Sequence, residues 1–276
     1  NIAMIDDEPV LFDCLEFSAV LATIDVLYDL AFLLMDLWAK GCRVEANMLF
    51  NRYLDVSPED EDAVVLIPLF LSIRAAVRAH VAAAQANGDP SSALRKKAEQ
   101  YLSLAHELLA PGPTRLVAIG GLSGTGKSTI ARLVAYGVGS APGARILRSD
   151  VLRKRLAGLP PETPLSKEAY STSASAAVYA ELERLAQLAL NEGRSLIVDA
   201  VYARPDERRA IAQVAAQKNV PFAGIWLDAP SEVLKARIAA RVNDASDADV
   251  AVAGLQAHYD LGAMDWRRVS AEGDRG

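Results

Sequence analysis

Cysteine and histidine are scarce in this sequence. Its 276 residues include two cysteines, Cys14 and Cys42, and three histidines, His80, His106 and His258. The number and spacing of these side chains fit neither a disulfide framework nor a cluster of metal ligands. We therefore expect reduced thiols in a cytoplasmic protein, and core or solvated positions for the histidines.

An excess of positive charge is also missing. The formal net charge is −6 and the isoelectric point is about 5.2. A nucleic-acid surface needs a basic stripe, and adhesion to an anionic membrane needs charge of the same sign. We therefore expect no nucleic-acid partner, and we favour small-molecule or protein partners.

Long uninterrupted apolar runs are absent as well. The most apolar stretches are residues 26–38 and 63–73, but Asp29 and Asp36 interrupt the first and Pro68 the second. A membrane-spanning helix needs about 20 predominantly apolar residues in succession. We therefore expect no membrane span. The 51% of hydrophobic residues is ordinary for a globular chain and is enough for two modest cores.

The sequence pattern changes once along the chain. From about residue 16 to 109 the apolar residues recur at the three- and four-residue spacing of helices. The segment APGPT, residues 110–114, then brings two prolines and a glycine. This break predicts a mostly helical region, residues 1–110, followed by a second domain, residues 115–276.

Beyond the break, short β-branched runs alternate with helical stretches. The predicted strands are RLVAIG, ARILRS, SLIVDA and PFAGIWLDA, and WRRVSA is a candidate fifth strand. Regular alternation of strand and helix implies a parallel sheet covered by helices on both faces. We predict an α/β fold of the P-loop NTPase type, with ligands at the carboxyl ends of the strands.

The strongest motif is the turn GGLSGTGKST, which lies between a predicted strand and a predicted helix and matches the phosphate-binding pattern G-x-x-x-x-G-K-[ST]. Its glycines let successive N–H groups point inward, and the following helix adds the positive end of its dipole. Lys127 is expected to reach the β- and γ-phosphates of ATP, and Ser128 to bind Mg²⁺. The predicted ATP-binding residues are Gly121, Ser123, Gly124, Thr125, Gly126, Lys127, Ser128 and Thr129.

Two carboxylates follow other predicted strands. Asp150 comes after the second strand and could orient or deprotonate an acceptor hydroxyl that faces the γ-phosphate. Its alternative role is to cap the next helix, and one Asp can do both. Arg153 and Lys154, one turn later, could hold an anionic acceptor. Asp199, near the end of SLIVDA, is predicted to bind Mg²⁺ through water, with a plain turn residue as the alternative.

A pair of arginines lies further along the chain. Arg237 and Arg241 are four residues apart, so they share one face of a predicted helix. On a segment over the phosphates, they would neutralise the charge of the transition state and exclude water. The alternative is surface ion pairing with Glu232 or Asp244.

Together these motifs resemble a known family. Residues 115 to about 271 resemble the small P-loop kinases of the AAA_33 type, which are related to gluconate kinase, polynucleotide kinase and zeta-toxin kinases. The motifs that carry the resemblance are GLSGTGKST, RSDVLRKRL, IVDAVYARPDERR and ARIAARVNDASDAD. The resemblance implies that Asp150 faces the acceptor hydroxyl and that Arg237 and Arg241 belong to a lid.

The first part of the chain resembles the C-terminal half of an aminoglycoside-phosphotransferase-like kinase lobe. NIAMIDDEPVLFDCLEFS resembles the segment between two metal-binding residues of such a lobe, here Asn1 and Asp13, and IDVLYDLAFLLMDL resembles the helix after it. The nucleotide-binding lobe and the catalytic His-x-Asp of that group do not precede this segment. The resemblance therefore implies a region without phosphotransferase activity, and we expect the sequence to be a fragment at both ends.

The sequence as a whole predicts an ATP- and Mg²⁺-dependent kinase that transfers the γ-phosphate to a hydroxyl of a small molecule. A guanine-recognition motif of the N/T-K-x-D type is absent, which disfavours a GTPase, and no arginine finger supports an ATPase motor. The alternative hypothesis is a nucleotide-binding regulatory module, in which ATP changes how an inactive kinase-like region docks on the P-loop domain. Residues 156–177 are expected to form a wall of the acceptor pocket, while the acceptor and the oligomeric state stay open.

Overall fold

The computed structural model describes residues 2–11, 23–89, 92–240, 245–247, 252, 254, 256 and 258–273. The described N-terminal part begins with an antiparallel hairpin of two strands, β1 (Ile2–Ile5) and β2 (Glu8–Leu11). Helical elements follow: α2 (Val26–Ala39), α3 (Arg43–Val56), the 3₁₀ segment η1 (Pro58–Leu66), α4 (Ile67–Gln85) and α5 (Ala93–Leu109). The prediction of a mostly helical first region is thus confirmed for the described residues.

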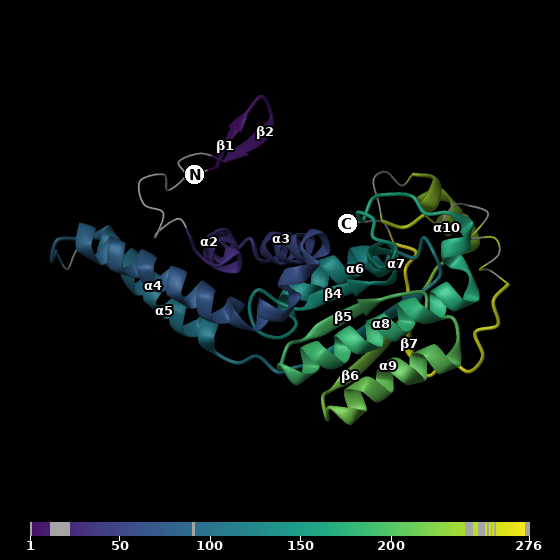
Figure 1. Cartoon of the computed structure of the whole chain (residues 1–276). Helices are drawn as coiled ribbons and strands as arrows, with labels where there is room; N and C mark the ends of the chain where they lie inside the picture. The colour runs from purple at the N-terminus through teal and green to yellow at the C-terminus, as the bar shows by residue number, and fades with distance from the viewer. Residues whose placement is uncertain are drawn as a thin grey trace.

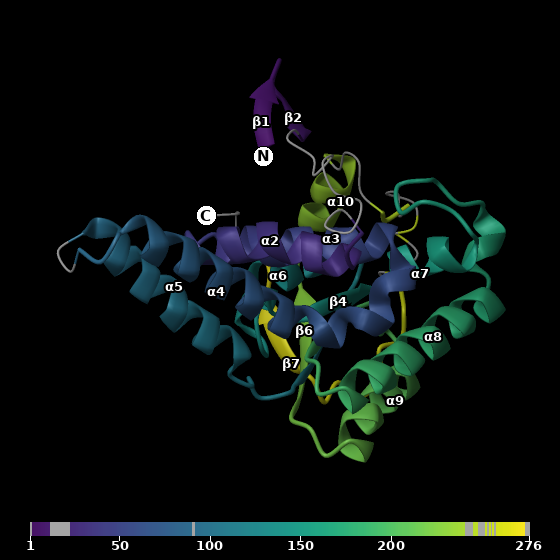
Figure 2. The same ribbon diagram turned by 60° about the vertical axis from the view of Figure 1, so that its left-hand side comes forward.

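The helical region has its own apolar core. Helix α2 starts after Asp25, whose carboxylate accepts a hydrogen bond from the Leu27 N–H at 2.8 Å. Its buried face, including Leu34 and Trp38, packs against α4, which in turn packs along α5. Helices α4 and α5 form an arm that extends away from the sheet (Figure 1). The same arm is visible in Figure 2.

One described segment of this region is strongly apolar. Residues Pro58–Gln85 are long and apolar enough to cross a membrane by length and composition alone, and 33% of the most apolar window is buried inside the fold. Core helices pass the same test. Leu71 and Ala75 of α4 are indeed buried in the helical core.

The second half contains a five-stranded parallel sheet with the order β4-β5-β3-β6-β7. The strands are β3 (Leu116–Gly121), β4 (Arg145–Arg148), β5 (Leu196–Asp199), β6 (Phe222–Asp228) and β7 (Arg267–Ser270). Strand β7 confirms the candidate strand in WRRVSA. The predicted α/β fold with a helix-covered parallel sheet is confirmed.

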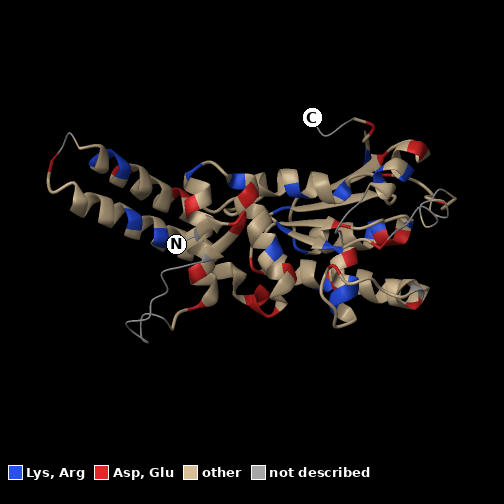
Figure 3. Cartoon of the chain, turned by 90° about the horizontal axis from the view of Figure 1, so that it is seen from above, with Lys and Arg blue, Asp and Glu red and all other residues tan. Residues whose placement is uncertain are grey.

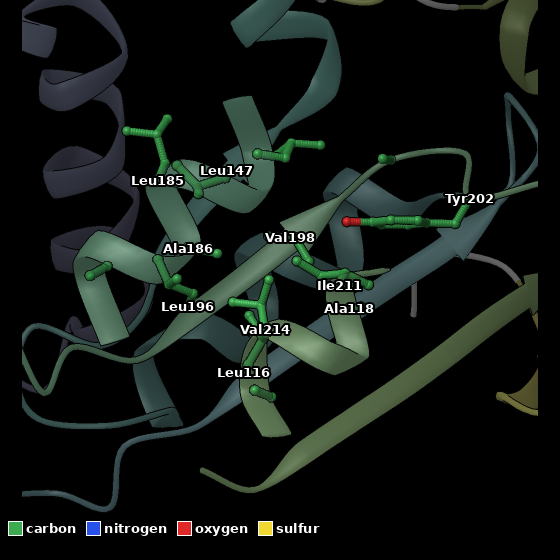
Figure 4. Close-up of a cluster of buried hydrophobic side chains, with 14 of the residues drawn as sticks. Leu116, Ala118, Leu147, Leu185, Ala186, Leu196, Val198, Tyr202, Ile211 and Val214 are labelled. Atoms are coloured by element: carbon green, nitrogen blue, oxygen red, sulfur yellow. The ribbon is translucent and has the colours of Figure 1, made fainter. Parts of the chain in front are cut away.

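Helices cover both faces of this sheet. They are α6 (Lys127–Val134), α7 (Ser149–Leu156), α8 (Thr172–Asn191), α9 (Pro205–Gln217) and α10 (Ser231–Ala239), with the 3₁₀ turns η2 (Ala135–Gly137) and η3 (Lys167–Tyr170). Leu196 and Val198 of β5 point into the core under α8 and α9 (Figure 4). The residue between them, Ile197, points to the opposite core with Ala131 of α6. This alternation is the period-two pattern of strands buried on both faces.

The predicted break lies between α5, which ends at Leu109, and β3, which starts at Leu116. The two halves are in contact across it, because α3 packs on α6 and η2 next to the edge strand β4. Figure 3 shows acidic and basic residues interspersed along both halves. The division into domains 1–110 and 115–276 stays a prediction.

Candidate functional site

A cleft of about 2320 Å³ lies at the carboxyl ends of the strands. It is bordered by the turn after β3, by the N-terminal parts of α7, α8 and α9, and by α10. The structure brings nearly all predicted ATP-binding residues to this cleft: Ser123, Gly124, Thr125, Gly126, Lys127, Ser128 and Thr129. Gly121 lies at the end of β3 behind them.

The turn has the backbone geometry of an anion cradle. Gly124 and Gly126 have φ values of +88° and +89°, in the left-handed region that favours glycine. A Cβ on Gly124 would lie 2.8 Å from the Leu234 carbonyl oxygen, whereas a Cβ on Gly126 would meet no atom within 4 Å. Helix α6 begins at Lys127, directly after the turn, so the free N–H groups of its first turn lie next to the glycine-rich turn. The conformation of the turn therefore depends on glycine, and its binding of phosphate stays a prediction.

The Lys127 side chain folds back over the turn. Its ammonium Nζ donates a hydrogen bond to the Leu122 carbonyl oxygen at 3.0 Å, and Thr125 Oγ1 donates to the same oxygen at 2.8 Å. Lys127 still lines the cleft. To reach a bound phosphate, the Lys127 ammonium would exchange the Leu122 carbonyl oxygen for a charged phosphate oxygen, which is a stronger acceptor.

Ser128 and Asp199 form the candidate metal site. The Ser128 hydroxyl donates a hydrogen bond of 2.5 Å to Asp199 Oδ2, although the two residues come from different elements. Asp199 is the last residue of β5 and only 4% exposed, and Arg148 Nε lies 3.7 Å from the same Oδ2. A hydroxyl and a carboxylate beside a phosphate cradle fit Mg²⁺, which takes one or two protein oxygens and completes its shell with phosphate and water.

Among the described residues, no group of three or more histidine, cysteine, aspartate or glutamate side chains is placed so that it could hold a metal ion.

Asp150 lines the same cleft, but the structure changes its expected local role. Helix α7 starts at Ser149, the cap position belongs to Arg148, and Asp150 lies within the first turn. The capping alternative is thus wrong. Burial is the main cause that raises the pKa of Asp150 above its ordinary value, and nearby Asp199 also raises it, while Arg148, Ser246 and Lys127 lower it.

The predicted acceptor wall faces the turn from the other side of the cleft. Leu165, Tyr170, Thr172 and Ser175, all from the segment 156–177, line it. The Arg153 guanidinium stands over the Tyr170 ring at 4.7 Å from its centroid, and Nη1 donates to the Ala169 carbonyl oxygen at 2.6 Å.

Lys154 does not contribute to this wall. It is fully buried, and its Nζ lies 2.9 Å from Asp247 Oδ1. The expectation that Lys154 could hold an anionic acceptor is therefore wrong, because its charge is already neutralised inside the protein.

The structure describes one of the two predicted lid arginines. Arg237 of α10 lines the cleft and donates to the Ala271 and Gly273 carbonyl oxygens at 2.7 and 2.8 Å. The alternative, an ion pair with Glu232, is not formed by Arg237, and that carboxylate instead pairs with Lys235 at 3.0 Å. Arg241 and Asp244 lie outside the described residues. The lid role of the arginines stays a prediction.

Two residues near the site, Gln256 and Asp247, are not among the predicted site residues, although Asp247 lies in the motif ARIAARVNDASDAD. Gln256 Oε1 accepts a hydrogen bond of 2.8 Å from the Ser123 N–H of the turn. Asp247 accepts hydrogen bonds from the Tyr170 hydroxyl at 2.7 Å and the Leu165 N–H at 3.0 Å, in addition to its ion pair with Lys154. These contacts join residues far apart in the chain, so no local motif predicts them.

The resemblance of the first region to a kinase lobe rests partly on residues that the structure does not describe. Asn1 and Asp13, its two expected metal-binding positions, lie outside the described residues. The resemblance stays a prediction.

Comparisons with known proteins identify relatives. Residues 116–259 match the family AAA_33, an AAA domain. The uncharacterized proteins Rv2004c of Mycobacterium tuberculosis (strain H37Rv) and Mb2027c of Mycobacterium bovis are each 34% identical to this chain over 284 residues. Each alignment covers 100% of this chain and 55% of the relative. The chain therefore spans about half the length of the curated relatives it matches.

Several solved structures are also similar. A putative kinase from Chloroflexus aurantiacus is 22% identical, with a TM-score of 0.45, over 58% of this chain and 89% of that one. A gluconokinase from Sinorhizobium meliloti 1021 is 19% identical, with a TM-score of 0.40, over 60% of this chain and 86% of that one. The APS kinase CysC of Mycobacterium tuberculosis is 27% identical, with a TM-score of 0.36, over 46% of this chain and 69% of that one.

Proposed function

Because the chain belongs to the AAA_33 family, whose match spans residues 116–259, we propose that it is an ATP- and Mg²⁺-dependent kinase for a hydroxyl of a small molecule. The observation that carries the proposal is the meeting of three strand ends at one cleft. The phosphate cradle follows β3, Asp199 ends β5, and Asp150 follows β4. Nucleotide binding needs only the cradle, whereas an acceptor-facing carboxylate is what phosphoryl transfer adds.

In the proposed reaction the turn amides and the N-terminus of α6 hold the ATP phosphates. Lys127 leaves the Leu122 carbonyl and pairs with the β- and γ-phosphates. Ser128 and Asp199 hold Mg²⁺, which when bound neutralises charge on the phosphate oxygens.

Asp150 is the proposed general base. Its carboxylate accepts the proton of the acceptor hydroxyl as the acceptor oxygen forms a bond to the γ-phosphorus, and the bond from that phosphorus to the bridging oxygen of ADP breaks. A pKa raised by burial suits this role, because a base with a higher pKa takes a proton more readily. Arg237, which borders the cleft, and Arg241 are proposed to stabilise the transferred group.

The direct test is ATP consumption with Mg²⁺ against a panel of sugars, sugar acids, nucleosides, UDP-sugars and aminoglycosides. Stimulation by one class of acceptor, lost in Lys127→Ala, would support the kinase and name its acceptor class. ATP turnover that never depends on an acceptor would count against it. We also propose a cytoplasmic location and no nucleic-acid or membrane partner.

A second candidate function is nucleotide-dependent regulation, with residues 1–110 as an inactive region like a kinase lobe. It is supported by Arg148, which lines both the large cleft and a second cavity of about 240 Å³ beside α3. ATP should then change hydrogen exchange in α3. Unchanged exchange there, together with acceptor-dependent turnover, would leave only the kinase.

A further inference from the structure

Strand β4 is an edge of the sheet, and its free side is occupied by side chains of α3. Asn51 Oδ1 accepts a hydrogen bond from the Ile146 N–H at 2.7 Å, and Asn51 Nδ2 donates to the Ala144 carbonyl oxygen at 3.1 Å. One carboxamide thus makes the donor and acceptor contacts that a neighbouring strand would supply. Asn47 Nδ2 adds bonds of 3.0 Å to the carbonyl oxygens of Pro142 and Ala144.

The buried guanidinium of Arg145 forms ion pairs that join the same strand to the helical region. Arg145, the first residue of β4, is 4% exposed, and it pairs with Asp55 at 2.9 Å and with Glu61 at 3.1 Å. Its Nη1 also donates to Asn51 Oδ1 at 3.1 Å. Burial lowers the pKa of Arg145, but Glu61 and Asp55 outweigh it and the net shift is upward. The guanidinium therefore stays charged, and its partners fix the start of β4.

The other end of β4 enters the candidate site. The strand has four residues, so about 10 Å separates its first and last Cα atoms at the usual rise of a strand. Arg148, the last residue, lies 3.7 Å from the metal-site carboxylate of Asp199, and Asp150 follows within the first turn of α7. The residue held by α3 and the residue beside the metal-site carboxylate are therefore three positions apart on one strand.

We propose that α3 acts as a surrogate edge strand whose Asn51 carboxamide positions Arg148 and Asp150, so that the helical region is a working part of the catalytic centre. Asn51 touches none of the cleft residues that we assign to ATP or to the acceptor. It is a positioning residue that acts through β4. The proposed kinase mechanism does not use the first region, so this inference goes beyond it, while the roles of Asp150 and of the metal site rest on that proposed function.

The test compares Asn51→Leu with Ser72→Ala. Both residues are 6% exposed polar residues of the helical region, but Ser72 bonds the Ala105 carbonyl oxygen at 2.8 Å, within the α4–α5 pair and away from β4. Two quantities are measured in the full chain: hydrogen exchange of α7, and the affinity for a fluorescent ATP analogue with and without Mg²⁺.

Asn51→Leu should lower the protection of the α7 amides against hydrogen exchange. It should also reduce the Mg²⁺-dependent gain in nucleotide affinity by about tenfold, which is the usual loss of metal affinity when a residue that supports the metal ligands is replaced. The Mg²⁺-free affinity should change less than the Mg²⁺-dependent gain, because the phosphate-binding turn follows β3 and not β4. Ser72→Ala should lower the melting temperature without either effect. Asn51→Asp keeps the acceptor for Ile146 and Arg145 but loses the donor to Ala144, so it should restore only part of the gain.

A purely structural role would overturn the proposal. Asn51→Leu would then lower the melting temperature while α7 protection and the Mg²⁺ gain stayed at wild-type values. If Asn51→Leu does not fold, Asn47→Ala is compared with Ser72→Ala by the same measurements and criteria. A wild-type chain with no Mg²⁺ gain would refute the proposed metal site instead, and the exchange of α7 would still decide the inference about α3.

Discussion

Replacing Asp150 with asparagine tests the proposed general base. The amide keeps the size of the carboxylate and its place in the first turn of α7, but it cannot take the acceptor proton. A positioned general base contributes about 10²- to 10⁴-fold to the rate, and we expect kcat to fall by this factor. The loss corresponds to about 3–5.5 kcal/mol of activation free energy. The affinity for ATP should be unchanged or tighter, because a negative charge leaves the neighbourhood of the phosphates.

The pH dependence of kcat/KM in the wild type tests the general-base role of Asp150 independently. Burial and the neighbouring Asp199 hold the pKa of Asp150 above its ordinary value. The base works when deprotonated, so kcat/KM should rise with pH through this raised pKa and be lost as the pH falls through it. The acid limb should therefore lie at higher pH than for an ordinary aspartate, and Asp150→Asn should remove it.

The assay is steady-state ADP release with the acceptor that the panel identifies, and calorimetry gives the affinity for ATP. Asp206→Asn is the matched control, since Asp206 lines the same cleft but is exposed and pairs with Arg204. That variant should keep turnover near the wild-type value. Unchanged turnover in Asp150→Asn, or a loss of ATP affinity as large as the loss of turnover, would refute the assigned role.

Three further variants test the phosphate-binding turn, the candidate metal site and the ion pairs of Arg145 with Asp55 and Glu61. Lys127→Ala should weaken ATP binding by about 3 kcal/mol, or about a hundredfold, because a charged contact to phosphate is lost; calorimetry that finds wild-type affinity would contradict the assignment. Asp199→Asn should lower turnover by about 10- to 100-fold. Removing Mg²⁺ with EDTA should then lower the turnover of this variant by a smaller factor than it lowers that of the wild type. Arg145→Met removes the arginine that lies nearest to Asp55 and Glu61 and leaves Glu61 with Arg194 at 3.8 Å, which should cost about 3 kcal/mol of unfolding free energy and about 6–12 °C in melting temperature. Urea unfolding measures this last effect, and a cost below about 1 kcal/mol, the size of a surface pair, would refute it.

The phosphate cradle could be predicted because it is local. Its glycines, Lys127 and Ser128 lie within eight consecutive residues, 121–128, and the strand and helix on either side are set by short-range periodicity. The alternation of strands and helices likewise implies the parallel sheet, since a parallel connection needs a crossover. Strand-end carboxylates then follow from the rule that parallel strands present their carboxyl ends at one edge.

The errors in the prediction concern side chains whose partners lie far away in the sequence. Lys154 follows Arg153 directly and looks equally suited to bind an anion, yet one points into the cleft and the other is buried against Asp247. The backbone carbonyls that Arg237 bonds, near the end of the described chain, are likewise far from it in the sequence, and its predicted lid role is not tested by them. Neighbouring residues on a helix face different surroundings, and the sequence does not state what those surroundings are.

The sequence by itself determined the strand-helix order, the phosphate-binding turn and the strand-end carboxylates, because each follows from residues close together in the chain. Only the tertiary structure decided that Ser128 meets Asp199, that Gln256 bonds the turn, and that Asn51 completes the edge of β4. These contacts depend on how whole elements are oriented against one another. That orientation is set by the packing of two cores and one interface, and no local spacing of residues encodes it.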